Sequence, residues 1–122
     1  MSESRELVVA AARAAASKQA RDVVVLDVRE LIVITDYFLI ASGTSDRQVR
    51  TIAEEIEAAL RDKGLKPVRR EGEREGHWAL LDFVDFVAHV FLDSDREFYD
   101  LERLWSDAPN VEWEEVTAST GG

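Results

Sequence analysis

The thirty residues from Gly76 to Trp105 constrain the fold more than any other part of this sequence. They open with an apolar run that is strand-like for about fifteen residues, longer than the roughly 3–10 residues of most strands. The segment Asp82–Asp85 interrupts this run and predicts a turn or a bulge between two strands. Ser94 and Glu97 then have the spacing of a capping box, which predicts a helix after them. Apolar residues follow at helical spacing and indicate its buried face: Phe98, Leu101, Leu104 and Trp105.

Helical and strand patterns alternate along the rest of the chain. The β-branched run 22–28 and the apolar run 37–42 predict two strands. They are too close in sequence for a parallel crossover, which needs about a dozen residues or more, so we expect an antiparallel pair. Ser45 and Gln48 form a capping box before an amphipathic helix that Gly64 ends. The remaining elements are a helix and a short edge strand, over residues 4–18 and 66–70.

This order of elements predicts an α/β fold with a mixed five-stranded sheet flanked by helices. A chain of 122 residues, 46% of them hydrophobic, has the size and composition of one folded domain. We place this domain at residues 1–107. Residues 108–122 are acidic and then small and polar, so we expect them to form a flexible C-terminal tail.

The composition narrows the classes of partner. The net charge of −10 repels phosphate backbones, so a basic protein is a better partner than a nucleic acid. Basic residues gather in segment 63–74, but glutamates interleave with them, so we expect at most a peripheral contact with RNA. The absence of cysteine excludes disulfides and thiolate metal ligands. No signal-peptide pattern and no apolar run of roughly 20 residues is present, so we expect a soluble cytoplasmic protein without a membrane anchor.

Two kinds of reaction centre were weighed against simpler explanations. Asp82, Asp85 and His89 could hold Mg²⁺ or Zn²⁺ if a turn brought them together. Turn capping by the aspartates and a hydrogen-bonded histidine in the sheet explain the same residues, so we expect no metal and no cofactor. The helix start at Gly43–Asp46, combined with Asp82 and Asp85, would make a minimal nucleotidyltransferase. The spacing Asp-x-x-Asp differs from the Asp-x-Asp that such an enzyme needs, so this enzyme is the alternative and not the first choice.

Aromatic residues and an arginine favour a recognition surface. Trp78, Phe83, Tyr99, Arg103 and Trp105 are of the types that dominate protein interfaces. Helical rotation takes Tyr99 off the apolar helix face, which predicts exposure. Trp78 opens a strand after a glycine turn, near the rim of the sheet. Burial in the core explains Trp78 and Tyr99 equally well, so the residues alone leave both explanations open.

Four blocks of the sequence, in order and at compatible spacings, resemble the ribosomal silencing factor S family, also called Iojap. They are TDYFLIASGTSDRQV at 35–49, GHWALLD at 76–82, DFVAHVF at 85–91 and FYDLERLW at 98–105. The resemblance covers roughly residues 5–107. This family commonly has Tyr-Gly-Asp where this chain has Phe83-Val84-Asp85. A glycine would permit a left-handed turn that Val84 resists, so a bulge could replace the turn here.

The resemblance implies a protein that is not an enzyme. Such proteins bind the large ribosomal subunit through ribosomal protein uL14, block subunit joining and repress translation when nutrients are scarce. It also implies homodimers, and a sheet that looks like a reduced nucleotidyltransferase. Trp78 and Tyr99 lie in matching blocks and are carried over as partner-binding residues. To these we add from our own reasoning Asp82, Phe83, Asp85 and Arg103.

Overall fold

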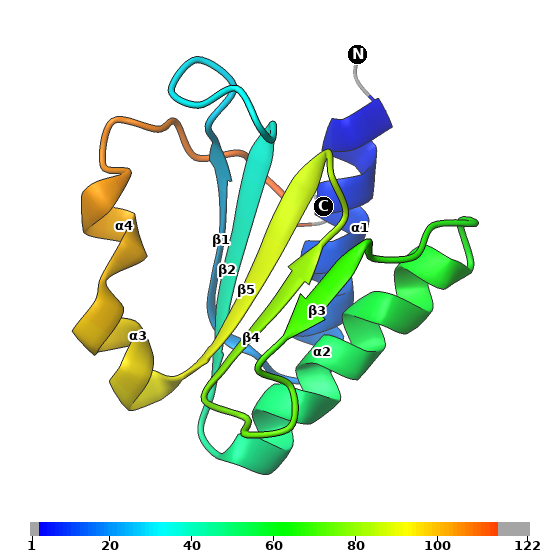
Figure 1. Ribbon diagram of the computed structural model, residues 1–122, viewed down its shortest axis with the longest axis vertical. Coiled ribbons are helices and arrows are strands. Elements are labelled where there is room, and N and C mark those ends of the chain that lie inside the picture. Colours follow the sequence, from blue (N-terminus) through cyan, green and yellow to red (C-terminus); the bar gives the residue numbers. More distant parts are fainter. Residues whose placement is uncertain (1–2, 115–122) are drawn as a thin grey trace, which may run out of the picture.

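The fold is a five-stranded sheet with helices on both faces. The computed structural model describes residues 3–114. In Figure 1 the sheet lies between α1 and α2 on one side and the shorter α3 and α4 on the other. The elements follow one another as α1 (Glu3–Ser17), β1 (Arg21–Asp27), β2 (Tyr37–Gly43), α2 (Asp46–Arg61), β3 (Arg69–Glu71), β4 (Trp78–Asp82), β5 (Phe86–Leu92), α3 (Asp93–Tyr99) and α4 (Leu101–Leu104).

The sheet is mixed, as the sequence predicted. Its strand order is β1-β2-β5-β4-β3. β1 and β2 pair antiparallel, which confirms the expected arrangement of the first two strands. β2 and β5 are the parallel pair, in register from Tyr37 opposite Phe86 to Gly43 opposite Leu92. The antiparallel pairs β4–β5 and β3–β4 complete the sheet and leave the charged three-residue β3 at one edge.

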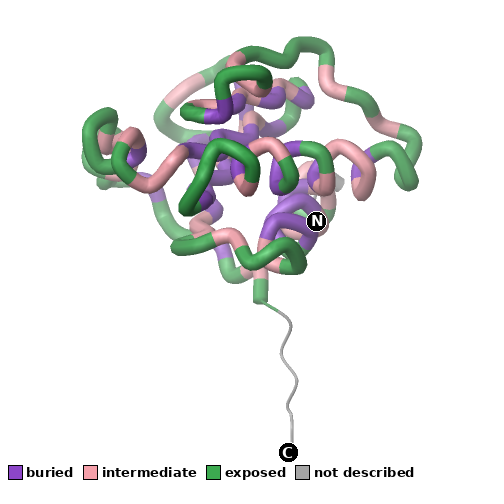
Figure 2. Tube along the Cα trace, turned by 90° about the horizontal axis from the view of Figure 1, so that it is seen from below, coloured by how far each residue is buried: buried purple, intermediate pink, exposed green. Residues whose placement is uncertain are grey.

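Side chains alternate between the two faces of the sheet and so build two cores. On β5, Phe86, Ala88 and Val90 join the larger core, which α1 and α2 cover. Phe91 belongs to a smaller core on the opposite face, where Trp105 packs against it from beyond α4. Figure 2 shows the buried positions gathered in the middle of the molecule and the exposed ones around the outside.

Helix α2 begins as its sequence predicted. The Ser45 hydroxyl accepts the backbone N–H of Gln48 at 3.1 Å. The Gln48 side chain reaches back and accepts the N–H of Thr44 at 2.7 Å, one residue before the cap. Its amide group also donates to the carbonyls of Lys18 and Gln19, which fixes the connection between α1 and β1. One local motif therefore both starts a helix and joins two distant segments.

The predicted C-terminal helix is divided into two short helices. The expected capping box at Ser94 and Glu97 does not form, because α3 already begins at Asp93 and its N-cap residue, Leu92, offers no capping side chain. Asp100 adopts a left-handed conformation with φ of 49° and separates α3 from α4.

This break changes which apolar residues are buried. Residues before and after the break do not belong to one continuous helix. The apolar residues that the helical spacing predicted on one side therefore do not share a face. Leu101 and Trp105 still pack against the sheet. Phe98 and Leu104, which the helical spacing placed on the buried side, are 80% and 71% exposed. The prediction for these two residues was wrong.

The first residues of the expected tail are part of the domain. The backbone N–H of Asp27 donates to the Pro109 carbonyl, and the N–H of Val111 donates to the Val25 carbonyl, each at 2.8 Å. The Trp113 indole donates to the main chain of β1 at 3.1 Å. The expected boundary at residue 107 is therefore too early, because these contacts cover the open edge of β1. The rest of the expected tail, residues 115–122, lies outside the described residues.

Candidate binding surface on the sheet

One face of β4 is only half covered. Ala79 and Leu81 point toward α1 and α2 and are buried, whereas Trp78, Leu80 and Asp82 point the other way and are half-buried. We call the ring-bearing surface on this side the aromatic face. Its members are Phe38, Trp78, His89, Phe91, Tyr99 and Trp105.

The rings of the aromatic face pack on one another across four elements. Trp78 of β4 lies 4.6 Å from Tyr99 of α3 and 4.8 Å from Phe91 of β5, measured between ring centroids. Phe38 of β2 lies 5.6 Å from Trp105 in an edge-to-face arrangement. Such pairs stabilise one another by about 0.5–1.5 kcal/mol beyond their area burial. The inner ring surfaces are thus held in place while parts of the outer surfaces remain in contact with solvent.

Trp78 and Tyr99 are therefore neither fully in the core nor free of it. Tyr99 is 44% exposed, as expected, although the single helix face from which its exposure was inferred does not form, and Trp78 is half-buried at the rim. The Trp78 indole N–H donates to Nδ1 of His89 at 3.1 Å. Burial lowers the pKa of His89 to about 4, so its imidazole is neutral near pH 7 and can accept this bond.

Beside this face, the turn between β4 and β5 contains a residue in the left-handed conformation, and this residue is valine and not glycine. Val84 has φ of 75°, and the N–H of Asp85 donates to the Phe83 carbonyl across it at 2.9 Å. An Asp82 carboxylate oxygen accepts the N–H of Val84 at 2.9 Å. The Thr35 hydroxyl donates to the Val84 carbonyl at 3.0 Å. These bonds hold a tight three-residue turn, so the expected bulge does not replace it.

The structure separates the residues that the sequence assigned to partner binding. Tyr99, Asp85 and Arg103 are exposed, and Asp82 is half-buried and lies 3.8 Å from the Arg69 guanidinium. Phe83 is different, because it is only 3% exposed and stacks on Phe86 in the larger core. It cannot touch a partner, and its assignment to the binding surface is corrected. The turn aims its side chain inward, which sequence spacing does not reveal.

Sequence reasoning missed several residues of this region. His89 was expected to be a hydrogen-bonded histidine in the sheet, which its bond to Trp78 confirms. Phe38 was assigned only to a strand, because the face on which it lies depends on the register between β2 and β5. Phe98 and Leu104 were assigned to the buried side of a helix and instead lie beside Tyr99 and Arg103 around a surface hollow. The signal for the last two was Asp100, a residue type that tolerates the left-handed conformation.

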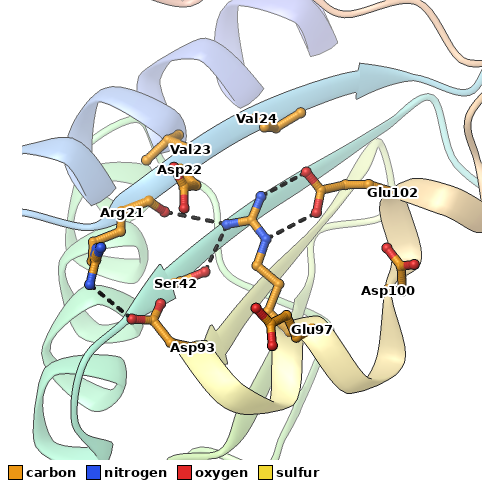
Figure 3. A pocket seen from close by; sticks show the side chains of 10 residues that line it. Arg21, Asp22, Val23, Val24, Ser42, Asp93, Glu97, Asp100 and Glu102 are labelled. Carbon is orange, nitrogen blue, oxygen red and sulfur yellow. Dashed lines mark hydrogen bonds and ion pairs between the residues drawn. The ribbon is translucent and has the colours of Figure 1, made fainter.

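Arg96 fixes the two short helices to the sheet. It is 9% exposed and donates two hydrogen bonds to the Glu102 carboxylate, at 2.9 and 3.0 Å. A third donor reaches the Ser42 hydroxyl at 2.7 Å, and the Arg21 carbonyl accepts another bond at 3.3 Å. Figure 3 shows Glu102 and Ser42 converging on this one guanidinium. Because the partners come from α4, β2 and β1, no local sequence pattern could have predicted the arrangement.

The groups of the alternative enzyme do not meet. Gly43 lies opposite Leu92 at one end of the β2–β5 pair, whereas Asp82 and Asp85 lie next to the other end, near Phe86. A seven-residue strand separates them by about 20 Å. Among residues 3–114, no three His, Cys, Asp or Glu side chains are placed to hold a metal ion, and Asp82, Asp85 and His89 do not form such a group. In the same part of the chain, no helix is both long and apolar enough to cross a membrane.

Fold and surface together define a small α/β protein with a partly exposed aromatic face on its sheet. A family model described as "Ribosomal silencing factor during starvation" matches residues 1–121. The chain therefore belongs to the ribosomal silencing factor family, which confirms the resemblance of the four sequence blocks.

Named relatives agree with this assignment. The chain is 41% identical to the ribosomal silencing factor RsfS of Halalkalibacterium halodurans, over 93% of this chain and 97% of the relative. It is 43% identical to RsfS of Bacillus subtilis, over 81% and 84% of the two chains. It is 34% identical to the chloroplastic protein Iojap of Zea mays, over 90% of this chain and 48% of that protein. The names of the two RsfS relatives describe a silencing role.

Solved structures support the fold. A crystal structure from Chromobacterium violaceum superposes with a TM-score of 0.83 at 30% identity, and it covers 98% of this chain and 95% of that one. A crystal structure from Bacillus halodurans gives a TM-score of 0.78 at 38% identity, with 88% and 97% covered. The mixed five-stranded sheet is therefore shared with solved proteins.

Proposed function

We propose that this protein binds the large ribosomal subunit in the cytoplasm through the basic ribosomal protein uL14, and that it prevents the small subunit from joining. Family membership supports a ribosomal role. The observation that carries the choice of surface is the ring pair Trp78 and Tyr99, which are in contact and remain partly exposed on the half-covered face of the sheet. Exposed rings of this kind are typical anchors of protein interfaces.

Charge and shape have different parts in this proposal. The net charge of −10 attracts a basic partner and speeds the encounter. Trp78 and Tyr99 then bury apolar surface, while Asp82, Asp85 and Arg103 at the rim orient the partner. This mechanism needs no chemical reaction. A protein of 13.8 kDa bound at the subunit interface excludes the small subunit by its volume. Repression of translation follows from this exclusion.

Trp78→Glu tests the surface directly. A carboxylate at this position removes the ring contact and places a charge against Tyr99 and Phe91, so we expect binding to isolated large subunits to fall at least about a hundredfold, as for a strong interface anchor. Co-sedimentation at modest salt measures binding, and circular dichroism checks the fold. Thr51→Glu on α2 is the matched control, since it adds the same charge to an exposed position on the other side of the sheet. Failure of the wild type to bind would reject the proposal, and equal binding of Trp78→Glu would reject this surface.

Subunit joining gives a second readout. Adding the wild type to separated subunits should lower the fraction of joined ribosomes in a sucrose gradient, and Trp78→Glu should leave that fraction unchanged. If the wild type binds large subunits and joining still proceeds, steric exclusion is wrong even though the partner is right.

A second copy of this chain is a competitor for the same surface. A homodimer that buries the aromatic face would have to dissociate before it binds the ribosome. Sedimentation velocity of the wild type and of Trp78→Glu separates the cases, because only a dimer built on this face becomes monomeric in the variant.

A further inference from the structure

His89 occupies a position where its imidazole is costly. It lies in the middle of β5, is 6% exposed and packs between Phe38 and Trp78, with ring centroids 5.1 and 6.0 Å away. Its Nδ1 accepts the Trp78 indole N–H at 3.1 Å. A neutral imidazole that accepts at Nδ1 carries its proton on Nε2. This Nε2 is buried and has no hydrogen-bond partner among residues 3–114.

The unpartnered Nε2 makes histidine a costly residue at this position. A buried donor without a partner lowers stability, and the edge-to-face ring of Phe38 offers at most a weak contact to an N–H group. Leucine would remove this donor, but it would also leave the indole N–H of Trp78 without its acceptor. The bond to Trp78 is therefore the feature that distinguishes histidine from leucine here.

The hydrogen bond between Trp78 and His89 fixes the orientation of the indole ring within its own plane, which ring packing does not fix. Phe91 and Tyr99 both pack against the Trp78 ring and restrain its plane. Only the indole N–H is directional, and its bond to Nδ1 determines which edge of the ring points into the protein and which points outward. The same bond occupies the only donor of the side chain, so this donor is unavailable to a partner.

We propose that His89 is a positioning residue that fixes the ring of Trp78 for partner recognition and hides its N–H, so that the partner meets only apolar ring surface at this point. The inference rests on the proposed function. It identifies the contacting group of the partner as an aliphatic or cationic side chain that lies on the ring, and not as a carbonyl that accepts from the indole.

His89→Leu is the first test. We expect the melting temperature to change little, because the variant removes the unsatisfied Nε2 but also leaves the Trp78 indole N–H without its acceptor, and these two effects oppose each other. We expect affinity for isolated large subunits to fall about tenfold, mainly through faster dissociation. His89→Gln, whose side-chain oxygen can accept the indole N–H, should recover part of that loss. A parallel loss of stability and binding in His89→Leu would make His89 merely structural and would overturn the inference.

The state of Trp78 itself is read by NMR, independently of the ribosome. The indole N–H signal that disappears in Trp78→Phe belongs to Trp78. Its hydrogen exchange should be slow in the wild type and clearly faster in His89→Leu. If the exchange does not change, the bond does not hold the ring and the inference is wrong.

A double-mutant cycle shows whether His89 acts through Trp78. In the Trp78→Phe background the indole donor is absent, so adding His89→Leu should not weaken binding further. Additive losses would contradict the inference. If the wild type does not bind large subunits at all, the proposed function fails, while the exchange of the indole N–H still decides whether His89 holds the ring. If the wild type binds and His89→Leu binds equally well, the positioning role fails alone.

Discussion

At the scale of single residues, Val84 has a strained backbone conformation in the turn beside the aromatic face. Its φ of 75° is unusual for any residue with a β-carbon and more so for a β-branched one. Such conformations cost about 1–3 kcal/mol and persist where neighbours hold them. Here the Thr35 hydroxyl and the turn bond across Val84 do so. The chain therefore retains a turn that glycine would form without strain.

Val84→Gly should raise the free energy of unfolding by about 1 kcal/mol, because the relieved strain exceeds the roughly 0.5–1 kcal/mol that extra chain entropy costs. Little burial is lost, since Val84 is 53% exposed. The midpoint of urea unfolding measures the change. Val33→Gly is the control: Val33 is 99% exposed and is not among the residues with positive φ, so it should lose a little stability. A lower midpoint for Val84→Gly would show that the turn is not strained.

His89 makes stability depend on pH in a definite direction. Burial lowers the pKa of His89 to about 4, below the ordinary value of about 6.5. Below pH 6.5 the unfolded chain takes up a proton at this site and the folded protein does not. The contribution of the neutral residue is complete above pH 6.5 and declines as the pH falls toward 4, by about 3 kcal/mol in all.

Urea unfolding of the wild type and of His89→Leu, at pH 7 and at about pH 4.5, should reveal the contribution of His89 to the pH dependence of stability. Carboxylates titrate in both, so their part cancels when the wild type is compared with His89→Leu. The wild type should lose about 2–3 kcal/mol more than the variant between the two pH values. Equal losses would mean that His89 is protonated in the folded protein as easily as in the unfolded chain.

At the scale of elements, α3 and α4 depend on one side chain more than on their own helical propensity. Helices of seven and four residues are too short to be stable alone. Arg96 joins both to β2 and β1 through Glu102, Ser42 and the Arg21 carbonyl. The Arg21 side chain adds an ion pair to Asp93 at 3.1 Å (Figure 3). The exposed rings of Phe98 and Tyr99 are therefore positioned from the sheet.

Arg96→Met should loosen α3 and α4 and leave the sheet intact. Removing the guanidinium strips Ser42 and Glu102 of their charged partner and should cost about 2 kcal/mol. Amide hydrogen exchange should rise over residues 93–104 and stay slow in β2, and binding to large subunits should weaken because Tyr99 is no longer held. Arg47→Met on the exposed side of α2 is the control. Uniformly faster exchange in all strands would show that Arg96 supports the whole fold and not these two helices.

The same contrast between local and distant interactions explains what the sequence could predict. The α2 helix was predicted because Ser45 and Gln48 act within one turn, and the β1–β2 pair because its link is short. The break at Asp100 had one local signal, a residue type that tolerates the left-handed conformation, and the helical spacing of the apolar residues concealed it. Phe83 was assigned to the surface because its residue type suits an interface, whereas the turn points it into the core. Trp78 and Tyr99 were assigned to partner binding through the resemblance, and only the structure shows that Trp78 packs on Tyr99 and bonds to His89.

At the scale of the whole molecule, the two faces of the sheet have different roles. The face toward α1 and α2 holds the larger core and therefore most of the apolar burial. The other face holds the smaller core and leaves the rings of Trp78 and Tyr99 partly exposed. On the proposed function, substitutions at the partly exposed Trp78 and Tyr99 should therefore weaken binding more than they weaken the fold, whereas substitutions at the buried Phe91 should affect both.

Net charge is the property of the whole molecule that should govern association. A charge of −10 acts over roughly the Debye length, about 10 Å at 0.1 M salt, and so steers a basic partner before contact. The association rate with isolated uL14, and with large subunits at constant Mg²⁺, should therefore fall by roughly tenfold between low and high KCl, while the dissociation rate changes little. Trp78→Phe should show the opposite pattern, with faster dissociation and an unchanged salt dependence, because it alters short-range contact and not charge. Biosensor kinetics resolve both rates. An association rate that does not respond to salt would remove electrostatic steering from the mechanism and leave the aromatic face as the only basis of recognition.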